Sequence, residues 1–277
     1  MRGKVAMVTG ANSGMGREIA IGLARIGASL VMVCRDRKRG ELACIDVQQQ
    51  TGNPDVELLV ADLSSQQSIR QMVEEFKAGH DRLNVLVNNA GMTSATRTET
   101  VDGLETVFAT NHLGPFLLTN LLLPVLMASA PARIVIVSSG AQAMGKIDFG
   151  DLQGVRGYGE IRAYNASKLA NIMFTYELAR RIKGSGVTAN AVEPGFVKTN
   201  LKVPFPFNIF SFMRGKAVDG ARPSVFLASS PEVEGVSGAF FSNKGVPIKS
   251  SKITYDDATV NRLWAVSAEL THLGNAT

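Results

Sequence analysis

The sequence has few of the features that mark secreted, metal-binding or nucleic-acid-binding proteins. Its 277 residues include only two cysteines, and the spacing of Cys34 and Cys44 suits neither a metal site nor a disulfide framework. The formal charge of +5 is mild, and cationic residues cluster only at 35–39, which favours a small anionic ligand over a nucleic acid. We therefore expect a cytoplasmic protein in a reducing compartment, with no metal and no nucleic-acid partner.

Long hydrophobic runs are also scarce. The most apolar stretch, 116–130, contains Asn120 and Pro124 and is shorter than a helix that spans a bilayer. A strand is expected to begin at Lys4, so we expect no signal peptide before it. These features predict a soluble protein without a transmembrane anchor, while peripheral membrane contact and homo-oligomerisation stay open.

The chain does contain a regular alternation of apolar runs and helical patterns. Strands are predicted at 4–9, 29–34, 56–61, 84–87, 133–137, 187–192 and 238–242, and helices at 17–26, 40–50, 65–78, 104–128, 217–228 and 258–270. A further apolar helical pattern begins near Tyr164. This alternation predicts an α/β fold: a single-domain, Rossmann-type, doubly wound parallel sheet of about seven strands with helices on both faces. No repeat or linker divides residues 1–277, so we expect one domain.

A glycine-rich turn follows the first predicted strand. Gly10, Gly14 and Gly16 stand in the spacing G-x-x-x-G-x-G between that strand and a helix. Backbone N–H groups at such a turn and the positive end of the helix can hold a phosphate group. Glycines that serve only helix packing are the alternative. The residues expected to bind a dinucleotide here are Gly10, Asn12, Ser13, Gly14, Met15 and Gly16.

The end of the second predicted strand bears on the choice of cofactor. An acidic residue at this position usually binds the ribose 2′-hydroxyl of NAD, whereas an arginine accommodates the 2′-phosphate of NADP. The strand here ends in Cys34-Arg35-Asp36. Arg35 can pair with a phosphate in a bidentate way, and the alternative is a solvated, basic helix start. The sequence therefore favours NADP(H), although Asp36 keeps NAD open.

Tyr164 and Lys168 are the most suggestive pair of reactive side chains. They lie four residues apart in a helical pattern, which places them on one face of a helix. A phenol has a pKa near ~10, and a nearby ammonium group lowers it toward the range useful for a general acid or base. The pair is therefore a candidate catalytic unit, with an ordinary surface pair as the alternative.

Taken in order, these motifs resemble the short-chain dehydrogenase/reductase family, and the resemblance covers nearly the whole chain. The matching residues are Thr9, Gly10, Gly14, Gly16, Asp62, Asn88, Asn89, Ala90, Gly91, Asn111, Ser139, Tyr164, Lys168, Pro194 and Gly195. Within the family, Cys34-Arg35-Asp36 and the stretches 167–172 and 177–181 resemble the retinol dehydrogenase-like branch.

The resemblance implies an NADP(H)-dependent oxidoreductase that interconverts an alcohol with an aldehyde or ketone. Tyr164 would exchange the proton, while Lys168 would lower the tyrosine's pKa and hold the nicotinamide ribose. Ser139 would hydrogen-bond the reacting oxygen, and Ser138 is its competitor for that role. Asn111 would position a water that links Lys168 to solvent.

The resemblance also implies contacts beyond these four residues. The further cofactor-binding residues would be Asp62, Leu63, Asn88, Ala90, Gly91, Pro194, Gly195, Val197 and Thr199. The phenylalanine-rich stretch 203–213 would belong to a substrate lid around 198–215, with an interface as the alternative, and a C-terminal extension would follow around 245–277. We therefore expect a small lipophilic alcohol or carbonyl substrate. The alternatives are a catalytically silent NADP-binding sensor or scaffold and an enoyl-type C=C reductase.

Overall fold

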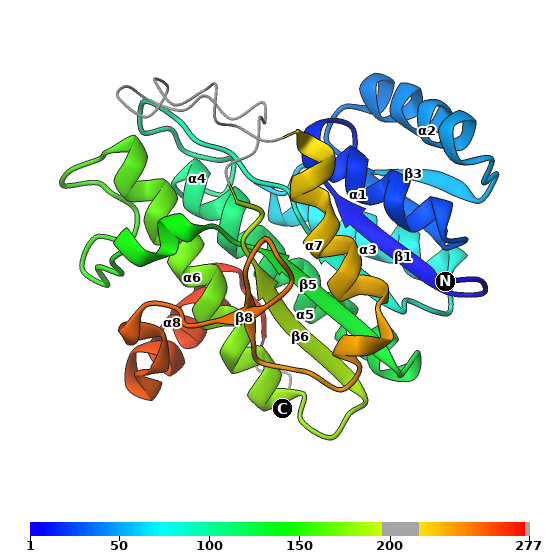
Figure 1. The fold of residues 1–277 in the computed structure, drawn as a ribbon. Coiled ribbons are helices and arrows are strands. Elements are labelled where there is room, and N and C mark those ends of the chain that lie inside the picture. Colours follow the sequence, from blue (N-terminus) through cyan, green and yellow to red (C-terminus); the bar gives the residue numbers. More distant parts are fainter. Residues whose placement is uncertain (196–215, 275–277) are drawn as a thin grey trace.

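The computed structural model describes residues 1–195 and 216–274. Within them the chain forms one eight-stranded sheet in the order β3-β2-β1-β4-β5-β6-β7-β8 (Figure 1). The strands are β1 Val5–Thr9, β2 Ser29–Cys34, β3 Val56–Val60, β4 Val85–Asn88, β5 Ala132–Val137, β6 Val187–Val192, β7 Phe240–Phe241 and β8 Pro247–Ile248. The first seven pair in parallel, and β8 pairs with β7 in the antiparallel direction.

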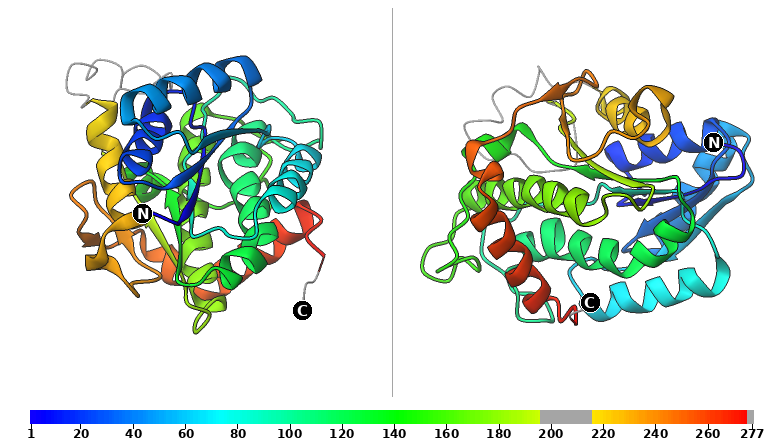
Figure 2. Two further views of the ribbon diagram at one scale, coloured as in Figure 1. Left: turned by 90° about the vertical axis from the view of Figure 1, so that its right-hand side faces the viewer. Right: turned by 90° about the horizontal axis from the view of Figure 1, so that it is seen from below.

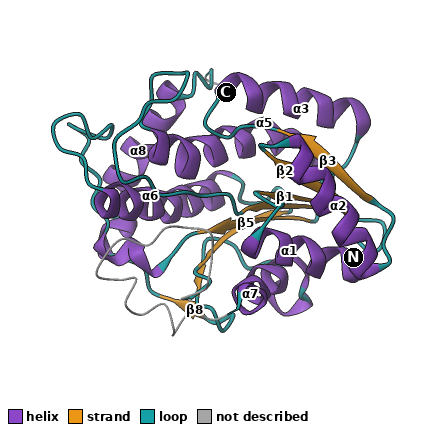
Figure 3. Cartoon of the chain, turned by 90° about the horizontal axis from the view of Figure 1, so that it is seen from above, coloured by secondary structure: helices purple, strands orange, loops and turns teal. Residues whose placement is uncertain are grey.

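Helices cover both faces of this sheet (Figures 2 and 3). The helices are α1 Gly14–Arg25, α2 Arg37–Thr51, α3 Gln66–Gly79, α4 Thr106–Phe108, α5 Gly114–Ala128, α6 Glu160–Arg181, α7 Ala217–Ser229 and α8 Asp257–Leu270. The layer of α1, α2 and α7 lies on one face, and α3, α5 and α6 lie on the other. Helix α8 packs against α6 from the outside of the second layer.

The strands carry an almost continuous run of buried apolar side chains because both faces of the sheet are covered. In β1, Ala6 and Val8 enter the core beneath α1, whereas Met7 enters the opposite core beneath α3 and α5. This alternation follows from the period of two residues in a strand. The fold class predicted from the sequence is confirmed.

The order of the strands places a ligand-binding crevice. From β1 the chain first builds outward through β2 and β3, and then returns to the other side of β1 to add β4 and β5. The connections that leave the carboxyl ends of β1 and β4 therefore diverge to opposite faces of the sheet. Ligands of doubly wound sheets bind at such a divergence.

The main departures from the predicted elements are local. Helix α1 begins at Gly14, inside the glycine-rich turn, rather than at residue 17. The predicted strand at 238–242 is reduced to Phe240–Phe241, and β8 was not predicted because two exposed residues that begin with Pro247 carry no strand pattern. The predicted helix at 104–128 is divided by a π-helical turn, η1 Ala109–Leu113.

The helical run Thr106–Ala128 is also longer than the apolar stretch recognised in the sequence. Asn120 and Pro124 both lie within α5, and Asn120 donates to the carbonyl of Phe116 in the preceding turn. By length and composition alone, this 23-residue run could cross a membrane, which corrects our expectation that its apolar stretch is too short. In this fold 61% of the qualifying window is buried, as is usual for a core helix.

Candidate active site

Thr9, at the carboxyl end of β1, ties the glycine-rich turn to the end of β4. Its Oγ1 atom accepts hydrogen bonds from the backbone N–H groups of Asn89 at 3.0 Å and Ala90 at 3.1 Å. The side-chain amide of Asn89 donates to the Thr9 carbonyl at 2.8 Å. Since Thr9 is fully buried, these bonds hold the two strand ends in a fixed relation.

The glycine-rich turn combines close packing with open space. A Cβ atom on Gly16 would lie 2.2 Å from the carbonyl oxygen of Gly10, so α1 can approach the turn only with glycine there. Gly10 itself has φ +65°, and a Cβ on it would lie 3.0 Å from Cα of Ala90. Gly14 has φ +55° but faces open space, with nothing within 4 Å of its Cβ position. Open space beside the start of a long helix fits a dinucleotide pyrophosphate.

The same turn contacts the end of β2. Burial raises the pKa of the Cys34 thiol to about 12, although the backbone N–H groups of Ala11 and Asn12 act to lower it. Asp36 accepts a hydrogen bond from the backbone N–H of Arg39 at 2.8 Å and so caps α2. Arg35 is exposed between them. The acidic residue is therefore engaged in the cap, and the arginine is the side chain presented at the strand end.

The side chains at the ends of β3 and β4 contact other protein groups, although the sequence predicts that they bind the cofactor. Asp62 accepts hydrogen bonds from the backbone and the hydroxyl of Ser64, and Leu63 packs in the core below α5. Asn88 is 2% exposed and donates to Thr119 Oγ1 at 2.9 Å, so its side chain points toward α5. Its Oδ1 atom is buried without a partner in the described part of the chain. All three side chains are therefore engaged within the protein.

The choice between the two serines after β5 is decided by their contacts. Ser138 is 2% exposed, and its hydroxyl donates to the carbonyl of Lys168 at 2.8 Å. Ser139 is partly exposed, and its side chain lowers the pKa of the Tyr164 phenol, against the opposing effect of burial. It also accepts a hydrogen bond from Ala141 N at 3.2 Å. Ser139 is therefore the serine that meets Tyr164.

The protonation of the tyrosine–lysine pair differs from our expectation. The pKa of Tyr164 is raised, because burial of the phenol disfavours its charged form more than the Ser139 hydrogen bond favours it. Lys168 Nζ lies 5.6 Å from the centre of the Tyr164 ring and donates to the Val137 carbonyl at 3.1 Å. Burial lowers the pKa of Lys168 to about 8. The net shift of the phenol pKa is thus opposite to the lowering that we predicted.

Asn111 lies in the π-helical turn η1 and is completely buried. Its amide donates to the Met92 carbonyl at 2.9 Å and to Ser167 Oγ at 3.0 Å, and its Oδ1 accepts from Met92 N at 2.8 Å. A Cβ on Gly91 would lie 3.4 Å from both Asn111 Oδ1 and Lys168 Nζ. Asn111 thus stands beside the lysine, with both amide protons engaged by protein groups rather than available to a water.

The last predicted cofactor contacts follow β6. Gly195 has φ +74°, and a Cβ on it would lie 2.7 Å from the side-chain amide of Asn243, so the turn after Pro194 requires glycine. Val197, Thr199 and the predicted lid at 198–215 lie outside the described residues. Of the predicted C-terminal extension, residues 245–274 are described and include β8 and α8.

Comparison with known proteins agrees with this geometry. A family model described as short chain dehydrogenase matches residues 4–206. Retinol dehydrogenase 14 of Mus musculus is 44% identical, over 96% of this chain and 85% of its own length. Retinol dehydrogenase 11 of Homo sapiens is 45% identical, over 97% of this chain and 86% of its own length. The chain belongs to the short-chain dehydrogenase/reductase family.

A solved structure extends the likeness to three dimensions. The crystal structure of an uncharacterised protein from Mycobacterium paratuberculosis matches with a TM-score of 0.82 and 35% identity, over 98% of this chain and 94% of that chain. Together with the relatives above, this places the short-chain dehydrogenase/reductase in the retinol dehydrogenase-like branch. It is an oxidoreductase of alcohols or aldehydes that uses a nicotinamide cofactor.

Three residues of this short-chain dehydrogenase/reductase site were given no role in the site from the sequence, although Thr9 belongs to the matched glycine-rich motif. Thr9 and Ser167 are fully buried hydroxyl residues that join separate parts of the site. Glu193, after β6, places its Oε2 3.0 Å from the Cβ position of Gly140, and burial raises its pKa. A polar residue ending a buried apolar run was a usable signal for Thr9, whereas the other two depend on contacts between distant segments.

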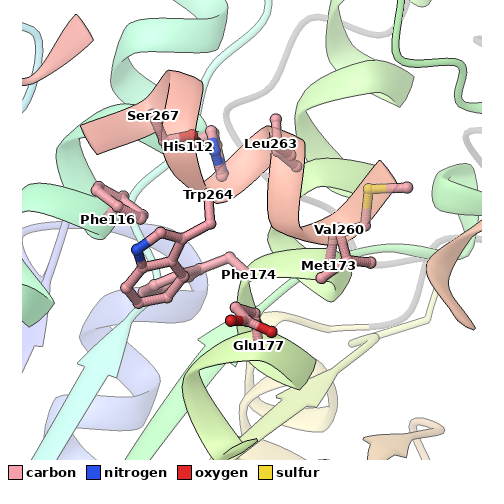
Figure 4. A pocket seen from close by; sticks show the side chains of 9 residues that line it. All are labelled: His112, Phe116, Met173, Phe174, Glu177, Val260, Leu263, Trp264 and Ser267. Atoms are coloured by element: carbon pink, nitrogen blue, oxygen red, sulfur yellow. Dashed lines mark hydrogen bonds between the residues drawn. The ribbon is translucent and has the colours of Figure 1, made fainter. Parts of the chain in front are cut away.

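Side chains from η1, α5, α6 and α8 line a small gap (Figure 4). In it, Trp264 of α8 packs edge-on against Phe116, and His112 hydrogen-bonds Ser267 of α8 at 2.9 Å. His112 also faces Asn171 Oδ1 at 3.4 Å. The gap belongs to the packing of α8 and offers no room for a substrate. Within the described ranges, no cluster of histidine, cysteine or acidic residues could hold a metal.

His112 is expected to make the fold sensitive to acid. Burial lowers its pKa to about 4, below the ~6.5 of an unfolded histidine. Between these values the unfolded chain binds the proton and the folded chain does not, so stability present above pH 6.5 is lost as the pH falls toward 4. Between pH 7 and pH 4, the free energy of unfolding measured with urea should fall by about 3 kcal/mol more in the wild type than in His112→Gln. Equal pH dependence in both proteins would contradict this assignment.

Proposed function

We propose that this protein is an NADP(H)-dependent oxidoreductase that reduces a lipophilic aldehyde or ketone, or oxidises the corresponding alcohol. The observation that carries the proposal is the pairing of Tyr164 with Lys168 one helical turn away, the ammonium group lying 5.6 Å from the centre of the tyrosine ring, with Ser139 acting on the phenol. This group stands at the carboxyl edge of the sheet, where β4 and β5 end beside the glycine-rich turn. Proton transfer and dinucleotide binding can therefore take place within one crevice.

The residues around the crevice fit a nicotinamide dinucleotide. The open side of Gly14 would take the pyrophosphate, and exposed Arg35 would take the 2′-phosphate that distinguishes NADP from NAD. Gly195 would bring the backbone after β6 close to the nicotinamide end. The cofactor supplies the hydride, and the protein supplies orientation and proton transfer.

The protonation state of Tyr164 suits reduction at neutral pH. Because its pKa is raised, the phenol holds its proton and can donate it to a carbonyl oxygen. The Ser139 hydroxyl would hydrogen-bond the same oxygen as negative charge develops on it. With a pKa near 8, Lys168 keeps most of its positive charge at pH 7 and would hold the nicotinamide ribose. Alcohol oxidation needs the phenolate, and we expect it to become faster as the pH rises.

The relatives support a lipophilic substrate. Retinol dehydrogenases 11 and 14 carry a retinoid alcohol in their names and match nearly the whole of this chain. A retinoid or another apolar alcohol–carbonyl pair of similar size is the substrate class that we propose.

Cofactor oxidation with a panel of carbonyl compounds tests the proposal. NADPH and NADH consumption would be measured with all-trans-retinal, a medium-chain aldehyde, an aromatic ketone and a steroid ketone, and the products would be identified. We expect turnover with NADPH on at least one apolar carbonyl, with an alcohol as the product. A saturated carbonyl product from an unsaturated substrate would indicate a C=C reductase. Tight NADPH binding without turnover across the panel would indicate a sensor.

A further inference from the structure

Ser167 connects the two segments that carry the candidate catalytic residues. It lies in α6 between Tyr164 and Lys168 and is completely buried. Its hydroxyl donates to the backbone carbonyl of Tyr164 at 2.7 Å and lies 3.0 Å from the side-chain amide nitrogen of Asn111. One small side chain thus touches the turn of α6 that bears the tyrosine and the π-helical turn that bears the asparagine.

The direction of these hydrogen bonds is fixed by the groups involved. The Met92 N–H can only donate, so the amide atom of Asn111 that faces it must be the oxygen. The nitrogen of the same amide then gives one proton to the Met92 carbonyl and the other to Ser167 Oγ. Since a serine hydroxyl has one proton, and Ser167 gives it to the Tyr164 carbonyl, its oxygen is the acceptor from Asn111.

The result is a directed chain from the loop after β4 into α6. It runs from Met92 through Asn111 and Ser167 to the backbone of Tyr164, and every donor in it is used. Such chains strengthen their members and are costly to interrupt when buried. At the loop end of this chain, Gly91 stands against both Asn111 Oδ1 and the Lys168 ammonium group.

We propose that Ser167 is a positioning residue for catalysis, which orients Asn111 and thereby fixes the loop at Gly91 and Met92 relative to Tyr164 and Lys168. This inference rests on the proposed function of the tyrosine and the lysine. Without the Ser167 hydroxyl, one buried amide proton of Asn111 loses its acceptor. The Asn111 side chain can then rotate to find another acceptor, and this rotation breaks its hydrogen bond with the Met92 N–H.

The test compares Ser167→Ala with Thr175→Val. Thr175 is an equally buried hydroxyl residue of α6 that donates to the Asn171 carbonyl at 2.7 Å, two helical turns away from Ser167. Ser167→Ala is expected to lower kcat/KM about tenfold, whereas Thr175→Val leaves it within about twofold. If Ser167→Ala does not fold, the nearly isosteric Ser167→Cys gives the same test with a smaller loss.

A double-mutant cycle separates positioning from general destabilisation. If Ser167 acts through Asn111, adding Ser167→Ala to the Asn111→Leu variant should lower kcat/KM by less than a further factor of about two. Fully additive losses in kcat/KM would overturn the proposal.

Hydrogen exchange tests the same chain without depending on turnover. The amide of Met92 should exchange faster in Ser167→Ala than in the wild type, and at the wild-type rate in Thr175→Val. Faster exchange in Ser167→Ala, combined with a wild type that turns over no substrate, would support the chain while refuting the proposed function. Unchanged exchange in Ser167→Ala would overturn the chain even in an active enzyme.

Discussion

Replacing Tyr164 with phenylalanine is expected to lower kcat for carbonyl reduction about 10³-fold, while the Kd for NADPH changes by less than about threefold. General acid catalysis by a positioned side chain typically contributes about 10²–10⁴-fold. The substitution removes only the hydroxyl, whose pKa Ser139 lowers and burial raises. The ring and its packing remain, so the fold and the glycine-rich turn should be unaffected. Steady-state kinetics and titration of NADPH fluorescence measure the two quantities separately.

Tyr176→Phe is the matched control for this experiment. Tyr176 lies in the same helix, α6, about three turns beyond Tyr164, and its hydroxyl pairs with Ser250 at 2.8 Å. We expect Tyr176→Phe to retain at least a third of the wild-type kcat. A Tyr164→Phe variant that kept more than a tenth of wild-type turnover would contradict the role of Tyr164 as the proton donor. So would equal losses in the two variants.

The fold and the general location of the site were predictable because each depends on local sequence. Buried strands appear as short apolar runs, and a parallel sheet brings the polar residues that follow them to one edge. Thr9 at the end of β1 and Ser139 after β5 illustrate this directly. Gly10 and Gly16 were recognisable for a related reason, since a strand that turns sharply into a helix leaves no room for side chains at the contact.

The partners of individual side chains were not predictable, because they come from segments far apart in the sequence. Asn111 hydrogen-bonds Met92, 19 residues away, and Ser167, 56 residues away. The sequence does not reveal these contacts, so it could not show that they occupy the amide group that we expected to position a water. Lys168 directs its ammonium group to the Val137 carbonyl, 31 residues away. Burial therefore raises the pKa of Tyr164, whereas the helical spacing had suggested that Lys168 lowers it.

The second large effect concerns Arg35 and the choice between NADPH and NADH. We expect Arg35→Glu to lower the ratio of kcat/KM for NADPH to that for NADH by a factor of about 100 or more. Hydrogen bonds to charged groups are worth about 1.5–3 kcal/mol each, and a carboxylate near the 2′-phosphate adds repulsion. The same carboxylate can accept a hydrogen bond from the 2′-hydroxyl of NADH, so activity with NADH should rise rather than merely persist.

Lys38→Glu supplies the control, because it makes the same change in net charge from an exposed position in the first turn of α2. A long-range electrostatic effect would weaken NADPH binding similarly in both variants and would fade at high salt. Direct pairing with the 2′-phosphate predicts a much larger effect for Arg35→Glu. A wild-type preference for NADH would contradict the assignment at the outset. Asp36 could not then account for that preference in its present position, since its carboxylate caps α2, and the cap would have to open for the side chain to reach a ribose.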